Sequence, residues 1–138
     1  MISQTNIRTG RHCVFNLNAH LVFVTKYRKS VFNQKALTIL QIIFADVCEK
    51  FEATLVECNG ETEHVHLLVN YPPKVSLSKL VNALKGVSSR LLRKHLPNMK
   101  QHYWKGVLWS PSYFAGSCGG ITLEIVKQYI KSQTTPKE

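Results

Sequence analysis

Apolar and polar residues alternate along residues 12–25, and this period of two predicts a long strand with one side facing the core. After Asn33, and again after Ser76, apolar residues recur every three to four positions instead. This spacing predicts two amphipathic helices that begin at those N-cap residues. The second helix is expected to end before Pro97.

The remaining segments complete the pattern of a small α+β domain. Two strands are predicted over residues 53–58 and 62–70, joined by a turn at Asn59-Gly60. Residues 107–117 are aromatic and extended, which predicts a fourth strand interrupted near Pro111. Thr122 can cap a last helix that runs to about residue 133.

The predicted order is therefore β-α-β-β-α-β followed by a C-terminal helix. This order is typical of the ferredoxin-like, or RRM-like, fold: a four-stranded antiparallel sheet with helices packed on one face. The other face of the sheet is expected to be open. Because the sequence contains no repeat or interdomain linker, residues 1–138 are predicted to form a single domain.

The charge distribution favours a polyanionic partner. The chain has 18 Lys and Arg against 8 Asp and Glu, and neither the first 30 residues nor residues 64–123 contain an acid. A two-metal nuclease built on clustered aspartates is excluded because Asp46 is the one aspartate. No apolar stretch is long enough to predict a membrane span, and the four scattered cysteines suit a reducing cytoplasm.

One short motif within the third predicted strand has the spacing of a metal site. His64 and His66 are two residues apart, so both imidazoles project from the same face and can reach one metal ion. Glu61 and Glu63 are the nearest candidates to complete such a site. The apolar residues that alternate with the histidines are expected to pack against the helices. Spacing alone equally allows two histidines that simply face solvent.

The last helix contains a candidate nucleophile. Tyr129 and Gln133 are four residues apart and therefore lie on one helix face. A phenol has a free pKa near 10 and needs a neighbouring cation or base to react at neutral pH. A tyrosine that only packs at the core edge satisfies the same pattern.

Other aromatic and histidine residues leave their roles open. Tyr27 lies within the basic segment KYRK, and the aromatic residues between 103 and 114 can either stack on unpaired bases or fill the core. The histidines outside the HxH motif have no partner at a useful sequence spacing and are assigned no role: His12, His20, His95 and His102.

Five segments in register give the chain a family resemblance. LNAHLVFVTKYRKSVF, EHVHLLV, KGVSSRLL, LWSPSYF and YIKSQ occur in that order between about residues 11 and 133. Together they resemble the single-tyrosine HUH transposases, the TnpA type encoded by the smallest bacterial insertion sequences. The residue before the histidine pair is Glu63, where that family often has aspartate.

The resemblance implies an activity and a set of site residues. His64 and His66 match the HUH pair, and with Gln133 they would bind Mg²⁺ or Mn²⁺, while Tyr129 matches the nucleophile. The implied reaction is cleavage and rejoining of single-stranded DNA at insertion-sequence ends through a 5′-phosphotyrosine intermediate. The implied partners are single-stranded DNA with hairpin ends and a second copy of the chain, with no membrane and no nucleotide cofactor.

The resemblance also implies a cytoplasmic, nucleoid-associated protein of a bacterium or archaeon. Two alternatives stay open from the sequence. One is a non-catalytic module that binds single-stranded DNA or RNA hairpins, with the histidines as surface residues. The other is a domesticated tyrosine transposase that serves dispersed repeats.

Overall fold

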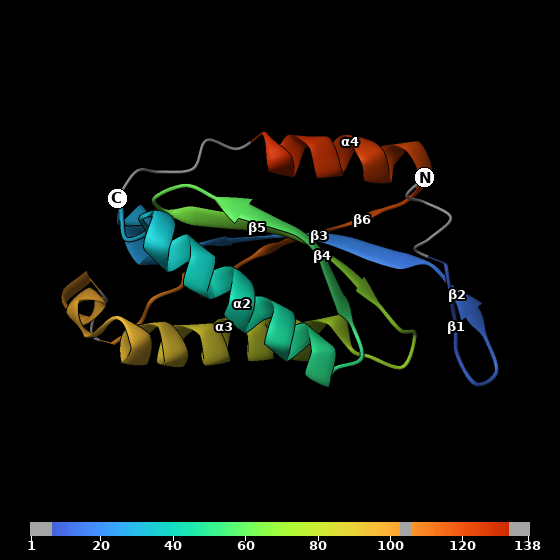
Figure 1. Ribbon diagram of the computed structural model, residues 1–138, viewed down its shortest axis with the longest axis horizontal. Coiled ribbons are helices and arrows are strands. Elements are labelled where there is room, and N and C mark those ends of the chain that lie inside the picture. The colour runs from blue at the N-terminus through green and yellow to red at the C-terminus, as the bar shows by residue number, and fades with distance from the viewer. Residues whose placement is uncertain (1–6, 103–105, 133–138) are drawn as a thin grey trace.

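A four-stranded antiparallel sheet in the order β4-β5-β3-β6 forms the centre of the molecule (Figure 1). The computed structural model describes residues 7–102 and 106–132. Helices α2 and α3 cover one face of the sheet and α4 covers the other, which confirms the predicted α+β class. The strands of the sheet are β3 (Leu17–Val24), β4 (Thr54–Gly60), β5 (His64–Tyr71) and β6 (Phe114–Cys118).

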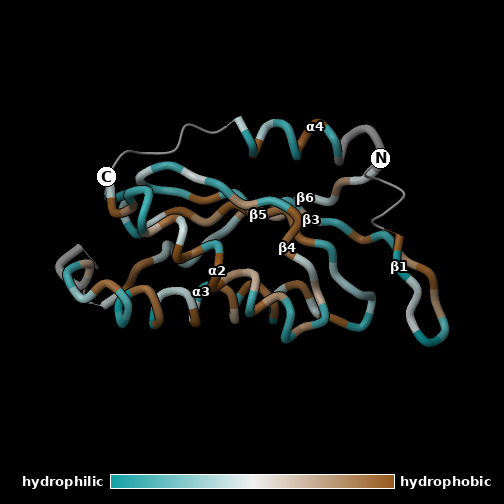
Figure 2. Tube along the Cα trace, in the orientation of Figure 1, coloured by the Kyte–Doolittle hydropathy of each residue, from teal (hydrophilic) through white to brown (hydrophobic). Residues whose placement is uncertain are grey.

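The two long helices begin where the sequence predicts. The Asn33 side chain accepts a hydrogen bond from the Ala36 amide at 2.9 Å, and the Ser76 side chain accepts one from the Lys79 amide. Their apolar residues pack in the core against the sheet. In Figure 2 these residues recur as brown segments along both helices. The helices are α2 (Gln34–Lys50), α3 (Leu77–His95) and α4 (Gly120–Lys131).

The first predicted strand is wrong over its N-terminal half. Only β3 joins the sheet, with the side chains of Leu21 and Phe23 fully buried beneath it. The residues before it turn back at residues 10–13, so that β1 (Arg8–Thr9) pairs with β2 (Val14–Phe15) in a separate hairpin. Cys13 and Phe15 continue the alternation of β3 back into β2, which is why the sequence pattern did not reveal the break.

The turn predicted at Asn59-Gly60 is also wrong, because both residues belong to β4. The turn is formed by residues 61–63. A Cβ atom on Gly60 would clash with the carbonyl oxygen of His64 and would lie 3.0 Å from the Cα of Val65. Glycine is therefore required for close approach of two strands, rather than for the turn itself.

The C-terminal part of the chain differs from the prediction in two ways. β6 covers only the second half of residues 107–117, although Trp109 makes an isolated bridge to Thr25. α4 is capped at Gly119, so Thr122 lies inside the helix rather than before it. The predicted helix end at residue 133 lies outside the described residues.

α4 packs on the sheet face that was predicted to be open. Ile130 and Leu68 are fully buried against each other, with Val126 of α4 and Val56 of β4 packed around them. Apolar side chains on this side of the sheet need a cover, and α4 supplies it. Within the described residues no helix is long and apolar enough to cross a membrane.

A strained turn follows β3. Tyr27 and Arg28, in the short 3-10 turn Lys26–Arg28, have φ values of 58° and 52°. L-residues other than glycine pay about 1–2 kcal/mol each for this left-handed conformation. The chain then returns to the sheet, where the amides of Val31 and Phe32 donate to the Thr62 carbonyl.

Candidate functional site

The candidate site lies on the sheet face that α4 covers, and β5 supplies its histidines. Val65, Leu67 and Val69 point to the opposite face and are buried against α2 and α3, as the alternation predicts. His64 and His66 therefore share the α4 side, with ring centroids 5.0 Å apart and planes at 84°. The predicted common face of the histidine pair is confirmed.

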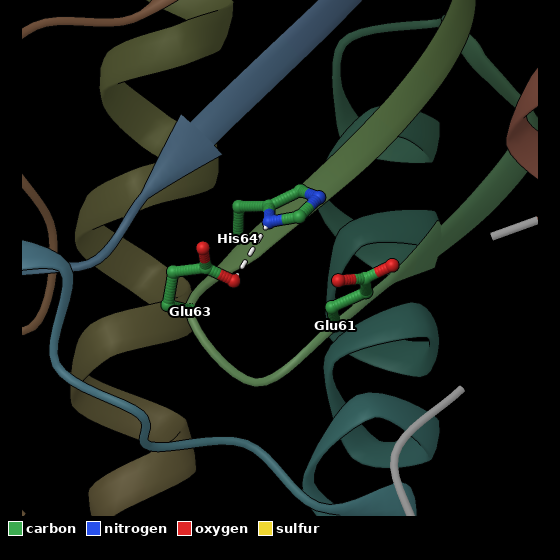
Figure 3. A group of neighbouring side chains, drawn as sticks. All are labelled: Glu61, Glu63 and His64. Carbon is green, nitrogen blue, oxygen red and sulfur yellow. Dashed lines mark hydrogen bonds and ion pairs between the residues drawn. The ribbon is translucent and has the colours of Figure 1, made fainter. Parts of the chain in front are cut away.

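Two carboxylates approach His64 from the turn before β5. Glu61, Glu63 and His64 each offer a ligand atom, and these atoms lie within 4.8 Å of one another (Figure 3). His64 Nδ1 lies 2.9 Å from Glu63 Oε1. Burial would raise the pKa of Glu63, but the hydrogen bond to His64 and the nearby Arg28 charge outweigh it and hold the pKa below its usual value.

His66 has a partner that sequence analysis missed. His20 Nε2 lies 3.0 Å from His66 Nδ1, and the two rings are stacked with centroids 5.2 Å apart. The sheet register explains the contact: His20 pairs with Leu68, and His66 lies two residues away on the same face of the neighbouring strand. Sequence spacing cannot link two residues that are 46 positions apart. The one local signal for His20 was the alternation along its strand, which puts its side chain on this face.

Burial keeps His20 and His66 neutral. Burial and the neighbouring His64 and His20 lower the pKa of His66 to about 4, and burial also lowers the pKa of His20. Neutral imidazoles are the form that binds metal ions. When Nδ1 of His66 donates to His20, Nε2 of His66 is left with its lone pair available.

α4 brings Tyr129 to the same histidines. The Tyr129 ring lies edge-on to His66, with centroids 5.2 Å apart at 89°, and 6.4 Å from the ring of His20. Half of the Tyr129 side chain is exposed, so an external substrate can reach it. The buried Ile130 next to it and an ion pair between Lys131 and Glu57, at 3.6 Å, fix α4 on the sheet.

The donor atoms fit a hard divalent cation. Carboxylate oxygens beside imidazole nitrogens suit Mg²⁺ or Mn²⁺ better than soft metals. Both His64 and His66 are engaged at Nδ1 by another side chain, which is the usual way in which proteins orient a ligating histidine. Gln133, the third predicted ligand, lies outside the described residues.

The assembled face brings an exposed phenol and a potential cation site together. An exposed phenol lies against an imidazole whose neighbour shares a potential cation site with two carboxylates. This combination is suited to nucleophilic attack on an anionic ester, with the cation site binding the ester oxygens. The sequence predicted the histidines, the carboxylate candidates and the tyrosine, and the structure brings all of them to one face.

Comparisons with known proteins agree on one family. The family model described as "Transposase IS200 like" matches residues 13–133. The chain is 31% identical over 133 residues to the ISDra2 transposase TnpA of Deinococcus radiodurans, covering 96% of this chain and 95% of that protein. It is 31% identical over 122 residues to the transposase for insertion sequence element IS200 of Salmonella typhimurium, covering 88% and 80%.

Solved structures show the same relationship. A crystal structure from Deinococcus radiodurans superposes with a TM-score of 0.75 at 34% identity, covering 93% of this chain and 98% of the other. A REP-associated tyrosine transposase bound to a REP hairpin superposes with a TM-score of 0.62 at 14% identity. It covers 89% of this chain and 69% of the other, and at that identity it supports the fold alone.

Proposed function

This chain belongs to the family of IS200-like transposases, and on that premise we propose that it cuts and rejoins single-stranded DNA at insertion-sequence ends. The proposed intermediate is a covalent bond between the Tyr129 phenol oxygen and a DNA 5′-phosphate. The observation that carries this proposal is the approach of Tyr129 to His66, on the face where His64 meets Glu61 and Glu63.

We assign the proposed metal site to His64, His66 and Gln133, with Glu61 and Glu63 close to His64. When bound there, Mg²⁺ or Mn²⁺ would supply Lewis-acid polarisation of the non-bridging oxygens of the scissile phosphate. Within the chain, Glu63 fixes the ring of His64 through Nδ1, and His20 does the same for His66. These contacts orient both imidazoles before DNA arrives.

The reaction exchanges one phosphate ester for another. The Tyr129 oxygen forms a bond to phosphorus, its phenolic proton leaves, and the bond from phosphorus to the 3′-oxygen breaks. That oxygen gains a proton and departs as a 3′-hydroxyl. A second 3′-hydroxyl then attacks the phosphotyrosine, which restores the phenol and joins new DNA ends. The two esters are similar in energy, so the cycle needs no nucleotide cofactor.

The proposed partners follow from charge and stoichiometry. Residues 64–123 contain cations and no acids, which suits a DNA backbone. A solved relative with the same fold is described as bound to a REP hairpin, and we propose hairpin-ended single strands as substrates here. With one nucleophile per chain and two ends per element, we propose a homodimer as the working unit.

A denaturing gel tests the proposal directly. The protein is mixed with single strands from the flanks of its own gene in Mg²⁺ or Mn²⁺, and a covalent protein–DNA band is expected. Tyr129→Phe and His64→Ala are expected to abolish the band. Tyr113→Phe is the matched control, because Tyr113 is 40% exposed against 49% for Tyr129 and lies outside the site.

Two outcomes would contradict the proposal. An adduct that survives Tyr129→Phe would assign the nucleophile to another residue. Tight hairpin binding without any adduct from the wild-type chain, on every strand tested, would favour a non-catalytic binding module instead. Chelation with EDTA distinguishes catalysis from DNA binding, because it is expected to stop adduct formation.

A further inference from the structure

The strained turn after β3 presents an aromatic ring to solvent. Tyr27 and Arg28 both have positive φ values, yet the Tyr27 side chain is 67% exposed. An exposed ring buries little apolar surface that would offset the strain of its backbone. Strained backbone of this kind persists only where the surrounding structure holds it, and it clusters at binding and catalytic sites.

This turn borders the candidate metal site. The Thr25 amide donates to the Glu63 carbonyl at 2.9 Å, and the Thr25 hydroxyl lies 3.2 Å from the same oxygen. Arg28 Nη1 lies 3.9 Å from Glu63 Oε2, and Glu63 in turn contacts His64. In Figure 3 the blue segment that follows β3 runs past Glu63. Glu63 therefore links this turn directly to His64.

The chemistry of the turn suits an unpaired nucleotide. Lys26 Nζ lies 5.2 Å from the centroid of the Tyr27 ring, and Arg28 and Lys29 are exposed beside it. No acid occurs in the first 45 residues of the chain. Aromatic rings flanked by cations bind single strands, since the ring stacks on a base while the cations neutralise the backbone.

A cavity continues from the turn. Lys26 also lines a cavity of about 380 Å³ on the α3 side, together with Lys85, Gly86 and Ser89. The Lys26 amide donates to the Leu108 carbonyl at 2.9 Å, which anchors the turn to the far wall of this cavity. Its lining residues include two lysines and no acid, which suits an anionic group such as a phosphate.

From these contacts we propose that Tyr27 is a stacking platform for an unpaired DNA base next to the phosphate at the His64 site, with Lys26 on the adjoining phosphate. The left-handed turn holds the ring outward, so little freedom is lost when a base binds. This assignment rests on the proposed function, because it adds a contact through which the same site binds its single strand. It predicts that Tyr27 contributes to DNA affinity and not to folding.

Binding measurements without chemistry test this role. In EDTA, and on a Tyr129→Phe background, a fluorescein-labelled oligothymidylate is titrated with protein and its anisotropy is followed. Tyr27→Gly is expected to weaken binding by about tenfold, which corresponds to the loss of one base–aromatic stack. Tyr27→Phe keeps the ring and is expected to stay within about twofold of the parent.

Thermal unfolding separates recognition from stability. Glycine accepts the positive φ at this position, so the melting temperature of Tyr27→Gly is expected to equal or exceed that of the parent. Ile42→Ala is the matched control, because Ile42 is also 67% exposed but lies on α2, away from the turn. This control is expected to leave the affinity unchanged.

Three results would overturn the proposed stacking role of Tyr27. Unchanged affinity in Tyr27→Gly would remove its role in binding, and a lowered melting temperature would make the role structural. Equal losses in the Gly and Phe variants would mean that the hydroxyl, not the ring, matters. If the wild-type chain still forms its covalent adduct in these cases, the proposed function stands and only the platform falls. A wild-type chain that neither binds nor forms the adduct contradicts both.

Discussion

At the scale of single residues, the candidate site is organised by contacts that cross between strands. His20 and His66 come from β3 and β5, and Tyr129 comes from α4. Each ring fixes the next, so the orientation of His66 depends on a residue that binds neither metal nor DNA in the proposed mechanism. His20 is therefore a positioning residue for the proposed metal site.

Removal of His20 is expected to weaken metal binding. In His20→Ala, His66 Nδ1 loses its partner, and loss of such a contact lowers metal affinity by about 10- to 100-fold. Isothermal titration with Mn²⁺ measures the affinity. His20→Gln restores a polar partner and is expected to recover most of it. Equal Mn²⁺ affinity in His20→Ala and the wild-type chain would refute the positioning role.

Residue type and spacing also determined which features of the site the sequence could predict. The common face of His64 and His66 follows from a spacing of two within one strand, which needs no knowledge of the rest of the molecule. Tyr27 lies in the KYRK segment that the sequence singled out, but its left-handed backbone did not follow from the residue type. Tyrosine has no intrinsic preference for positive φ, so long-range packing must impose it.

At the scale of elements, the helix starts follow their local sequence signals, whereas the turn between β4 and β5 does not. Asn33 and Ser76 cap their helices as predicted, because capping involves only neighbours in the sequence. Asn59-Gly60 is a strong local turn signal, yet the chain keeps both residues in β4. The requirement at Gly60 comes from the start of β5, where a side chain would meet the backbone of His64.

Two glycine substitutions test this reading of Gly60. Gly60→Ala is expected to lower the free energy of unfolding by about 1–3 kcal/mol, because the new Cβ must displace the backbone at His64. Gly86→Ala lies within α3 with nothing inside 4 Å, and is expected to raise it by about 0.5–1 kcal/mol. Urea unfolding of both variants gives the comparison. A tolerated Gly60→Ala would mean that this strand contact can widen at little cost.

At the scale of the whole molecule, the site couples to global stability through buried histidines. The unfolded chain protonates His66 near pH 6.5, whereas the folded chain does so only near pH 4. Between these values the unfolded state binds more protons than the folded state. The contribution of His66 to the free energy of unfolding is therefore complete above about pH 6.5 and is lost as the pH drops towards 4. His20, whose pKa burial also lowers, acts in the same direction.

Acid unfolding of the metal-free chain measures this coupling. The His66 contribution is expected to reach about 3 kcal/mol between pH 6.5 and pH 4, with no further loss from this residue below that. Urea midpoints are recorded in EDTA at a series of pH values. His66→Gln removes the titrating group and is expected to flatten the curve. A variant curve as steep as that of the wild type would assign the acid sensitivity elsewhere.

The sequence alone determined the features that arise from short-range physics. Periodicities of two and of three to four residues gave the strands and helices, capping residues gave helix starts, and the uneven charge indicated a polyanionic partner. The histidine pair, its two carboxylate candidates and Tyr129 were all identified at this level. Five motifs in register then gave the family.

Only the tertiary structure decided which of these residues meet. Strand register joined His20 to His66, and the packing of α4 through Ile130 put Tyr129 beside them rather than leaving the sheet face open. The turn at Tyr27 reached Glu63 by way of Thr25. Such contacts join residues far apart in the chain, so their loop-closure entropy is offset only when the whole core forms, and no local pattern records them.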